Sequence, residues 1–124
     1  MKMHKYKFTI AFADTDAAGI VYHARFIEIA ERARMDWLRD NILADKDTGI
    51  VIKKLSIKYD APLNLMDEIV VESFISNTGA ASADIEQRFV RDGAVCAVLH
   101  IRVVFVDIKT LRPKRIPDIW LGIL

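Results

Sequence analysis

The amino-acid sequence predicts an α+β fold, with one long helix against an antiparallel sheet of five strands. Three observations support this prediction: an alternating segment near the start, one helical pattern after it, and four further strand patterns joined by short turns. The 124 residues suit a single domain, 1–124, and 52% hydrophobic residues are ample for its core.

The first predicted strand covers residues 5–13, where apolar and polar side chains alternate with a period of two. Turn-forming residues at 14–19 then end the pattern. The face that we expect to be buried carries Tyr6, Phe8, Ile10 and Phe12.

A helix is predicted over residues 23–40, because apolar side chains recur there at spacings of three and four. The stripe runs from Tyr22 to Trp37 and is broad, so we expect the helix to be well covered. Charged residues, Arg34 among them, mostly lie off the stripe. The polar segment 41–48 is expected to be a loop.

The remaining strands are predicted over 49–59, 68–76, 82–91 and 94–106. A change of phase at Lys53-Lys54 indicates a β-bulge, and Asn77-Thr78-Gly79 and Asp92-Gly93 indicate hairpins. The last strand is apolar on both faces, which is typical of a central strand or a subunit contact. A short helix is expected from Pro117.

Composition excludes several classes of protein. A net charge of +1 argues against a general nucleic-acid binder, and a single cysteine rules out an internal disulfide. No apolar run approaches the ~18 residues of a membrane span, and no signal peptide is visible. We therefore expect a cytoplasmic domain without membrane insertion. One helix covers only one face of such a sheet, so we also expect a homo-oligomer.

The loop between the first strand and the helix concentrates the reactive side chains. A carboxylate there can act as base or nucleophile, and the N–H groups that open a helix can receive developing negative charge. Plain turn residues are the alternative interpretation of Asp14 and Asp16. A calcium loop is excluded, because Ala18 and Arg25 stand where ligands are needed. The loop therefore predicts an active site for acyl transfer.

The motif Asp14-Thr15-Asp16-Ala17-Ala18-Gly19-Ile20-Val21-Tyr22-His23, followed by Arg25-Phe26 and Glu31-Arg32-Ala33-Arg34, resembles the 4-hydroxybenzoyl-CoA thioesterase family of hotdog-fold proteins. Its tol–pal-associated acyl-CoA thioesterase branch is the most similar. The resemblance covers nearly the whole chain. It implies a five-stranded sheet wrapped around one long helix and hydrolysis of acyl-CoA to an acid and a free thiol. It also implies homodimers joined edge to edge, commonly paired into homotetramers, and no cofactor besides the coenzyme A of the substrate.

The resemblance also assigns the site residues. Asp16 is the expected catalytic carboxylate, as nucleophile or as general base, whereas Asp14 is expected to be structural. The backbone N–H of His23 is expected to polarise the thioester carbonyl, and its imidazole counts as an active-site side chain. No metal ligand is predicted. The expected substrate-binding residues of the same loop are Gly19, Val21 and Tyr22.

The sequence departs from the family pattern at two places. Phe12 stands where the branch often has a tyrosine, which removes a hydroxyl. Gly79-Ala80-Ala81 stands where the founding enzyme has basic residues that hold the CoA phosphates. The nucleotide of coenzyme A is therefore held by other cations, or held weakly, or the acyl carrier differs and is an acyl carrier protein. A non-catalytic binding or scaffold protein on the same fold is the alternative function.

Overall fold

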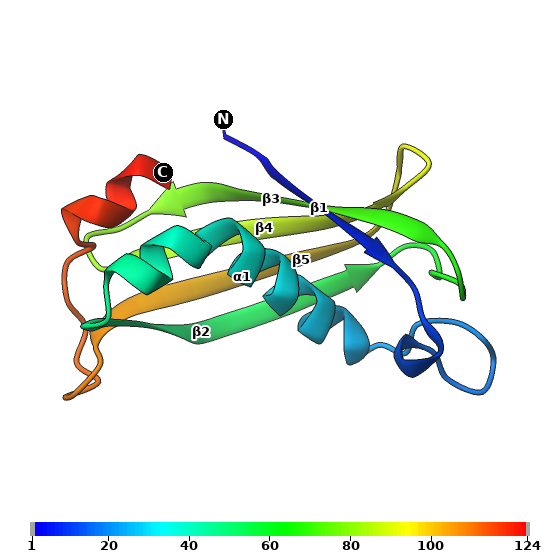
Figure 1. The fold of residues 1–124 in the computed structure, drawn as a ribbon, viewed down its shortest axis with the longest axis horizontal. Helices are drawn as coiled ribbons and strands as arrows, with labels where there is room; N and C mark the ends of the chain where they lie inside the picture. Colours follow the sequence, from blue (N-terminus) through cyan, green and yellow to red (C-terminus); the bar gives the residue numbers. More distant parts are fainter. Residues whose placement is uncertain (1, 124) are drawn as a thin grey trace.

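The structure is a computed structural model that describes residues 2–123, and it confirms one long helix against five antiparallel strands (Figure 1). Met1 and Leu124, which belong to the predicted domain 1–124, lie outside the described residues. The helix is α1 (Arg25–Ala44), and two short 3-10 helices are η1 (Phe12–Asp14) and η2 (Asp118–Ile123). The strands are β1 (His4–Thr9), β2 (Thr48–Tyr59), β3 (Glu68–Thr78), β4 (Ser82–Arg91) and β5 (Ala94–Asp107).

The strands are ordered β1-β3-β4-β5-β2, so β1 and β2 form the two edges of the sheet. The register between β2 and β5 shifts between Ile52 and Lys54, which confirms the predicted bulge. Asp92 and Gly93 both have positive φ, 50° and 80°, as a two-residue hairpin turn requires. β5 lies between β4 and β2, which explains why its sequence is apolar on both faces.

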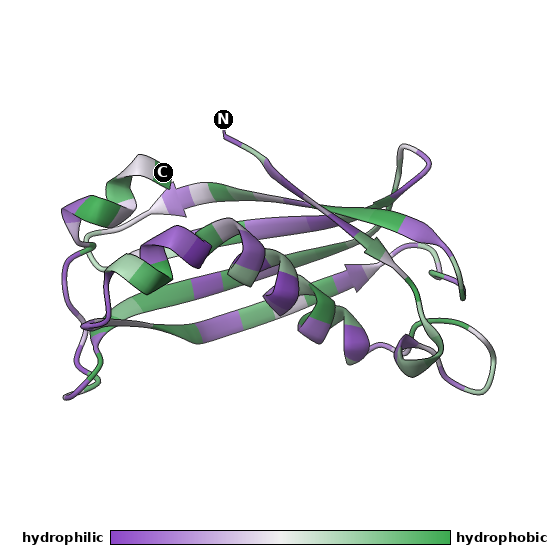
Figure 2. Ribbon diagram, in the orientation of Figure 1, coloured by the Kyte–Doolittle hydropathy of each residue, from purple (hydrophilic) through white to green (hydrophobic). Residues whose placement is uncertain are grey.

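The helix α1 lies across one face of the sheet, and the core fills the space between them (Figure 1). Alternation along β4 places Ala83, Ile85 and Phe89 in this core. Hydrophobic and hydrophilic residues alternate visibly along the strands (Figure 2). The opposite face of the sheet carries cross-strand ion pairs such as Asp84–Arg102, whose atoms are 2.8 Å apart. That face is therefore more polar than the sequence of β5 alone indicates.

The predicted first strand is too long. β1 ends at Thr9, and Phe12 is 82% exposed in η1 rather than buried. The N–H of Ile10 still donates to the carbonyl of Asp67 at 2.9 Å, in the register of β1 with β3, and the chain leaves the sheet after it. The Asp14 carboxylate then accepts the N–H of Ala11 at 2.8 Å, which closes the 3-10 turn. Alternation alone could not reveal this change of hydrogen-bond partners.

The bounds of the helix also differ from the prediction. α1 begins two residues later, at Arg25, because His23 and Ala24 form a turn. It continues to Ala44 instead of ending at Asp40, so part of the predicted loop is helical. Ile42 packs against the core in this added turn. Arg34, expected on the solvent side, is only 7% exposed.

The short C-terminal helix is confirmed as the 3-10 helix η2. Trp120 is buried there, and its indole N–H donates to the Asp45 carboxylate at 2.9 Å. η2 and the loop before α1 lie at opposite ends of the molecule (Figure 1). Within residues 2–123, no helix is long and apolar enough to cross a membrane.

Candidate active site

The segment between η1 and α1 is held by backbone hydrogen bonds. The N–H of Gly19 donates to the carbonyl of Asp16 at 3.0 Å, and the N–H of Asp16 to that of Ile20 at 2.9 Å. Gly19 has φ +79°, the left-handed conformation that its sequence position predicts. The N–H of Val21 donates to Leu63 at 2.8 Å, which fastens the loop to the turn after β2.

The two aspartates of the motif have different surroundings. Asp14 is 3% exposed; one carboxylate oxygen accepts from Arg25 Nε at 2.9 Å and the other from a backbone N–H. Asp16 is exposed, and its Oδ1 accepts the N–H of Ala18 at 2.9 Å. Among the described residues, no donor contacts Asp16 Oδ2. Asp14 therefore anchors the loop, whereas Asp16 keeps an oxygen available for chemistry.

A pocket of about 420 Å³ opens at the N-terminal end of α1 and collects most of the predicted site residues. Asp16, Val21, Tyr22 and His23 line it, whereas Gly19 does not. The remaining wall comes from Phe26 of α1 and from the end of β2 with its following turn. With Ile20 of the loop, the other lining residues are Phe26, Tyr59, Asp60, Ala61 and Pro62.

Tyr59, at the end of β2, is a site residue that sequence reasoning missed. Its hydroxyl donates to the backbone carbonyl of His23 at 2.7 Å, and its ring makes an edge contact with Phe26. Burial raises the pKa of the Tyr59 phenol, so the proton that makes this bond is retained at neutral pH. The predicted strand 49–59 includes Tyr59, but no pattern indicated its contact with the loop.

Arg91 of β4 holds the turn after β2 from the side away from the 14–23 loop. Arg91 donates from Nη1 to the Pro62 carbonyl at 2.9 Å and to the Asp67 carboxylate at 2.7 Å. The backbone N–H of Asn64 and then Arg91 hold the pKa of Asp67 below its ordinary value. This network stabilises the pocket wall opposite the loop.

His23 presents two groups at the pocket. Its imidazole is exposed, and none of residues 2–123 accepts a hydrogen bond from its backbone N–H. Free N–H groups at the start of a helix lie at the positive end of the helix dipole. A carboxylate and such N–H groups in one pocket can activate a nucleophile and stabilise an oxyanion.

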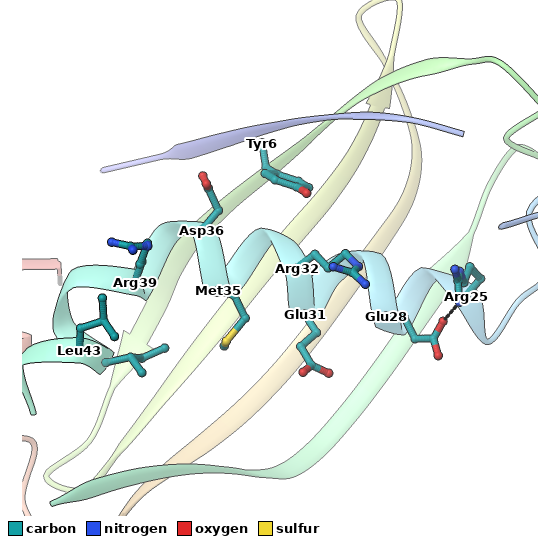
Figure 3. A pocket seen from close by; sticks show the side chains of 10 residues that line it. Tyr6, Arg25, Glu28, Glu31, Arg32, Met35, Asp36, Arg39 and Leu43 are labelled. Atoms are coloured by element: carbon teal, nitrogen blue, oxygen red, sulfur yellow. Dashed lines mark hydrogen bonds and ion pairs between the residues drawn. The ribbon is translucent and has the colours of Figure 1, made fainter. Parts of the chain in front are cut away.

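A larger depression, of about 690 Å³, lies on the outer face of α1 (Figure 3). Its lining consists mostly of exposed charged side chains of the helix, and it contains no residue of the 14–23 motif. Hydrogen bonding to Asp14, and then to Glu28, raises the pKa of Arg25, so this guanidinium already pairs with two carboxylates of the chain. The smaller pocket at the start of α1 is therefore the candidate site.

Comparisons with known proteins identify the family of the chain. A family model described as the thioesterase-like superfamily matches residues 10–122. The chain is similar to acyl-CoA thioesterase YbgC of Haemophilus influenzae, with 32% identity over 114 residues, 87% of this chain and 84% of that one.

Solved structures extend the comparison. The gentisyl-coenzyme A thioesterase BH1999 aligns with a TM-score of 0.83 and 29% identity over 93% of this chain and 97% of that one. A 1,4-dihydroxy-2-naphthoyl-CoA thioesterase from Synechocystis, 22% identical, has a TM-score of 0.86 over 98% and 94% of the chains. The fold expected from the motif is thereby confirmed.

Proposed function

Because the chain belongs to the thioesterase-like superfamily, we propose that it hydrolyses acyl-CoA thioesters to a carboxylic acid and a free thiol. The observation that carries this proposal is one pocket in which an exposed carboxylate, Asp16, lies with the N-terminal end of α1. The YbgC relatives, named as acyl-CoA thioesterases, support the same reaction.

In the proposed mechanism, the Asp16 carboxylate promotes formation of a new C–O bond at the thioester carbonyl by one of two routes. It either attacks the thioester carbonyl, giving an anhydride that water opens, or removes a proton from the attacking water. The C–S bond breaks, and the leaving thiolate takes up the proton that the water loses. The N–H of His23 stabilises the oxyanion, a contribution of typically ~3–4 kcal/mol for one donor. No metal ion or redox cofactor takes part.

We propose that the active form is a homodimer joined through β2, with a homotetramer as the larger assembly. Among residues 2–123, β2 pairs only with β5, so one of its edges has free backbone groups. An edge with exposed apolar side chains favours pairing with another strand. The second copy would also cover Asp16 and His23, which one chain leaves exposed. The exposed apolar residues of β2 are Val51, Ile52, Leu55 and Tyr59.

The test compares three aspartates. Asp16→Asn keeps the shape of the side chain but removes its charge, so turnover is expected to fall at least ~10²-fold with stability unchanged. Asp60→Asn is the matched control, because Asp60 lines the same pocket but pairs weakly with Lys58 at 3.7 Å; turnover should stay nearly normal. Asp14→Asn should lower the free energy of unfolding by about 1–3 kcal/mol, because it breaks the buried pair with Arg25.

Hydrolysis is measured with a thiol reagent over a panel of acyl chains, carried on coenzyme A and on an acyl carrier protein. Normal turnover by Asp16→Asn would refute the assignment, and its loss in Asp60→Asn would identify a different carboxylate. Tight binding of the acyl thioesters without release of thiol would establish the alternative, a binding or scaffold protein.

A further inference from the structure

A second cavity, of about 370 Å³, lies between the C-terminal half of α1 and the inner face of the sheet. It shares no lining residue with the pocket at the start of the helix. Residues of η2 line its end, so the two cavities lie toward opposite ends of the molecule (Figure 1). Its walls are largely apolar and include Leu38, Ile50, Ile75, Ile85, Phe105 and Trp120.

Arg34 is the cation of this cavity, and it is only 7% exposed. Its Nη1 donates to the Gln87 side-chain oxygen at 2.9 Å, and Gln87 is neutral. Among residues 2–123, no carboxylate lies within ion-pair distance of the guanidinium. A buried charge without a counterion is costly, so the cavity favours a ligand that brings an anion.

Glu31 is the one acidic residue in the lining. It precedes Arg34 by three residues on α1, but no ion pair joins them. Glu31 and Met35 project from the side of α1 opposite Tyr6 (Figure 3), and both line this cavity as well as the outer depression. Burial lowers the pKa of Arg34, and the charge of Glu31 opposes this shift. An entering anion therefore meets Arg34 inside and exposed Glu31 beside it.

We propose that this cavity binds a free carboxylic acid with an apolar body, its carboxylate paired with Arg34 and its body against the apolar walls. A guanidinium binds a carboxylate through parallel N–H bonds, and Arg34 has donors beyond the one that Gln87 uses. The volume lies at the lower end of small-molecule pockets, which suits a short fatty or aryl chain. Such acids are the products of the proposed hydrolysis, but the binding site stands independently of that reaction.

The experiment uses Trp120, which lines the cavity, as the reporter. The chain has two tryptophans, so Trp37→Phe leaves Trp120 as the only indole. Linear acids from hexanoate to decanoate are titrated against the fluorescence of this variant, with the amide of each acid as its uncharged match. We expect each added methylene to tighten binding about fourfold until the cavity is full. Each amide should bind at least tenfold more weakly than its acid.

Variants of the two charged residues sharpen the test. Arg34→Met should weaken binding of the acid at least tenfold and leave the amide unaffected. Glu31→Gln removes a repelling charge, so the acid should bind severalfold more tightly. Glu28→Gln is the matched control, since Glu28 lies on the same helix but does not line this cavity; binding should not change.

Several results would overturn the proposal. Equal binding of acid and amide would show that the carboxylate does not pair with Arg34. The absence of a saturable response to any acid would show that the cavity does not bind such acids. These titrations need no Arg34 variant, so they test the proposal even if Arg34→Met does not fold. If the fluorescence of Trp120 changes with protein concentration and not with added acid, a second copy of the chain covers the cavity. No thioester is present, so failure of the hydrolysis proposal leaves the result unaffected.

Discussion

Replacing Tyr59 with phenylalanine tests whether the end of β2 positions the start of α1. The variant deletes one hydrogen bond, 2.7 Å long, to the carbonyl of His23 and keeps the ring that contacts Phe26. Such a bond contributes about 0.5–1.5 kcal/mol. If that energy holds the turn at His23 in its reactive form, the reactive population falls about 2- to 12-fold without the bond.

We therefore expect kcat of Tyr59→Phe to fall by this factor with KM nearly unchanged, in a thiol-release assay. Tyr6→Phe is the matched control, because Tyr6 lines only the outer depression of α1. A merely structural role for Tyr59 would lower the melting temperature and leave kcat at 25 °C intact. Full kcat in a folded Tyr59→Phe variant would refute the positioning argument.

Three further predictions follow from the same geometry. His23→Ala keeps the backbone N–H, so turnover should drop about tenfold or less (under ~1.4 kcal/mol). A loss of turnover as large as that of Asp16→Asn would show that the imidazole is obligatory. Val51→Lys on the β2 edge should yield a 14.1 kDa monomer in light scattering. Val95 is the matched control, because it is also 42% exposed but lies outside β2, and Val95→Lys should leave the oligomer intact. The folded pKa of Asp67 lies below its ordinary 3.8, so its stabilisation is complete above that pH and is lost as pH falls through the folded value. Denaturant titrations should show Asp67→Asn less acid-sensitive than the parent chain below about pH 4.

The elements of this fold could be predicted because their patterns are local. The alternation of β4 and the hairpin at Asp92-Gly93 depend on residues next to one another in the chain. The end of β1 could not be predicted from alternation, because it depends on a side-chain bond: the Asp14 carboxylate takes the N–H of Ala11. Arg34 was misplaced because its partner Gln87 is 53 residues away.

The candidate site divides in a similar way. The motif with Asp16 and His23 is contiguous, so it could be found from residue types and spacing. Tyr59 and Pro62 reach the same pocket only because β2 ends beside the loop. Short-range patterns carry no information about that contact.

The two aspartates of the motif have separate roles: Asp14 holds the loop in place, and Asp16 is left free to react. A reactive carboxylate needs a free oxygen, and a loop needs strong contacts to stay in place; one side chain cannot easily do both. Asp14 meets the second need through Arg25, and the Val21–Leu63 and Tyr59–His23 bonds fasten the rest of the loop. The Asp16 carboxylate and the His23 N–H lie between these three anchors. Loosening any anchor should therefore lower turnover more than substrate affinity, because catalysis depends on how these two groups are aligned.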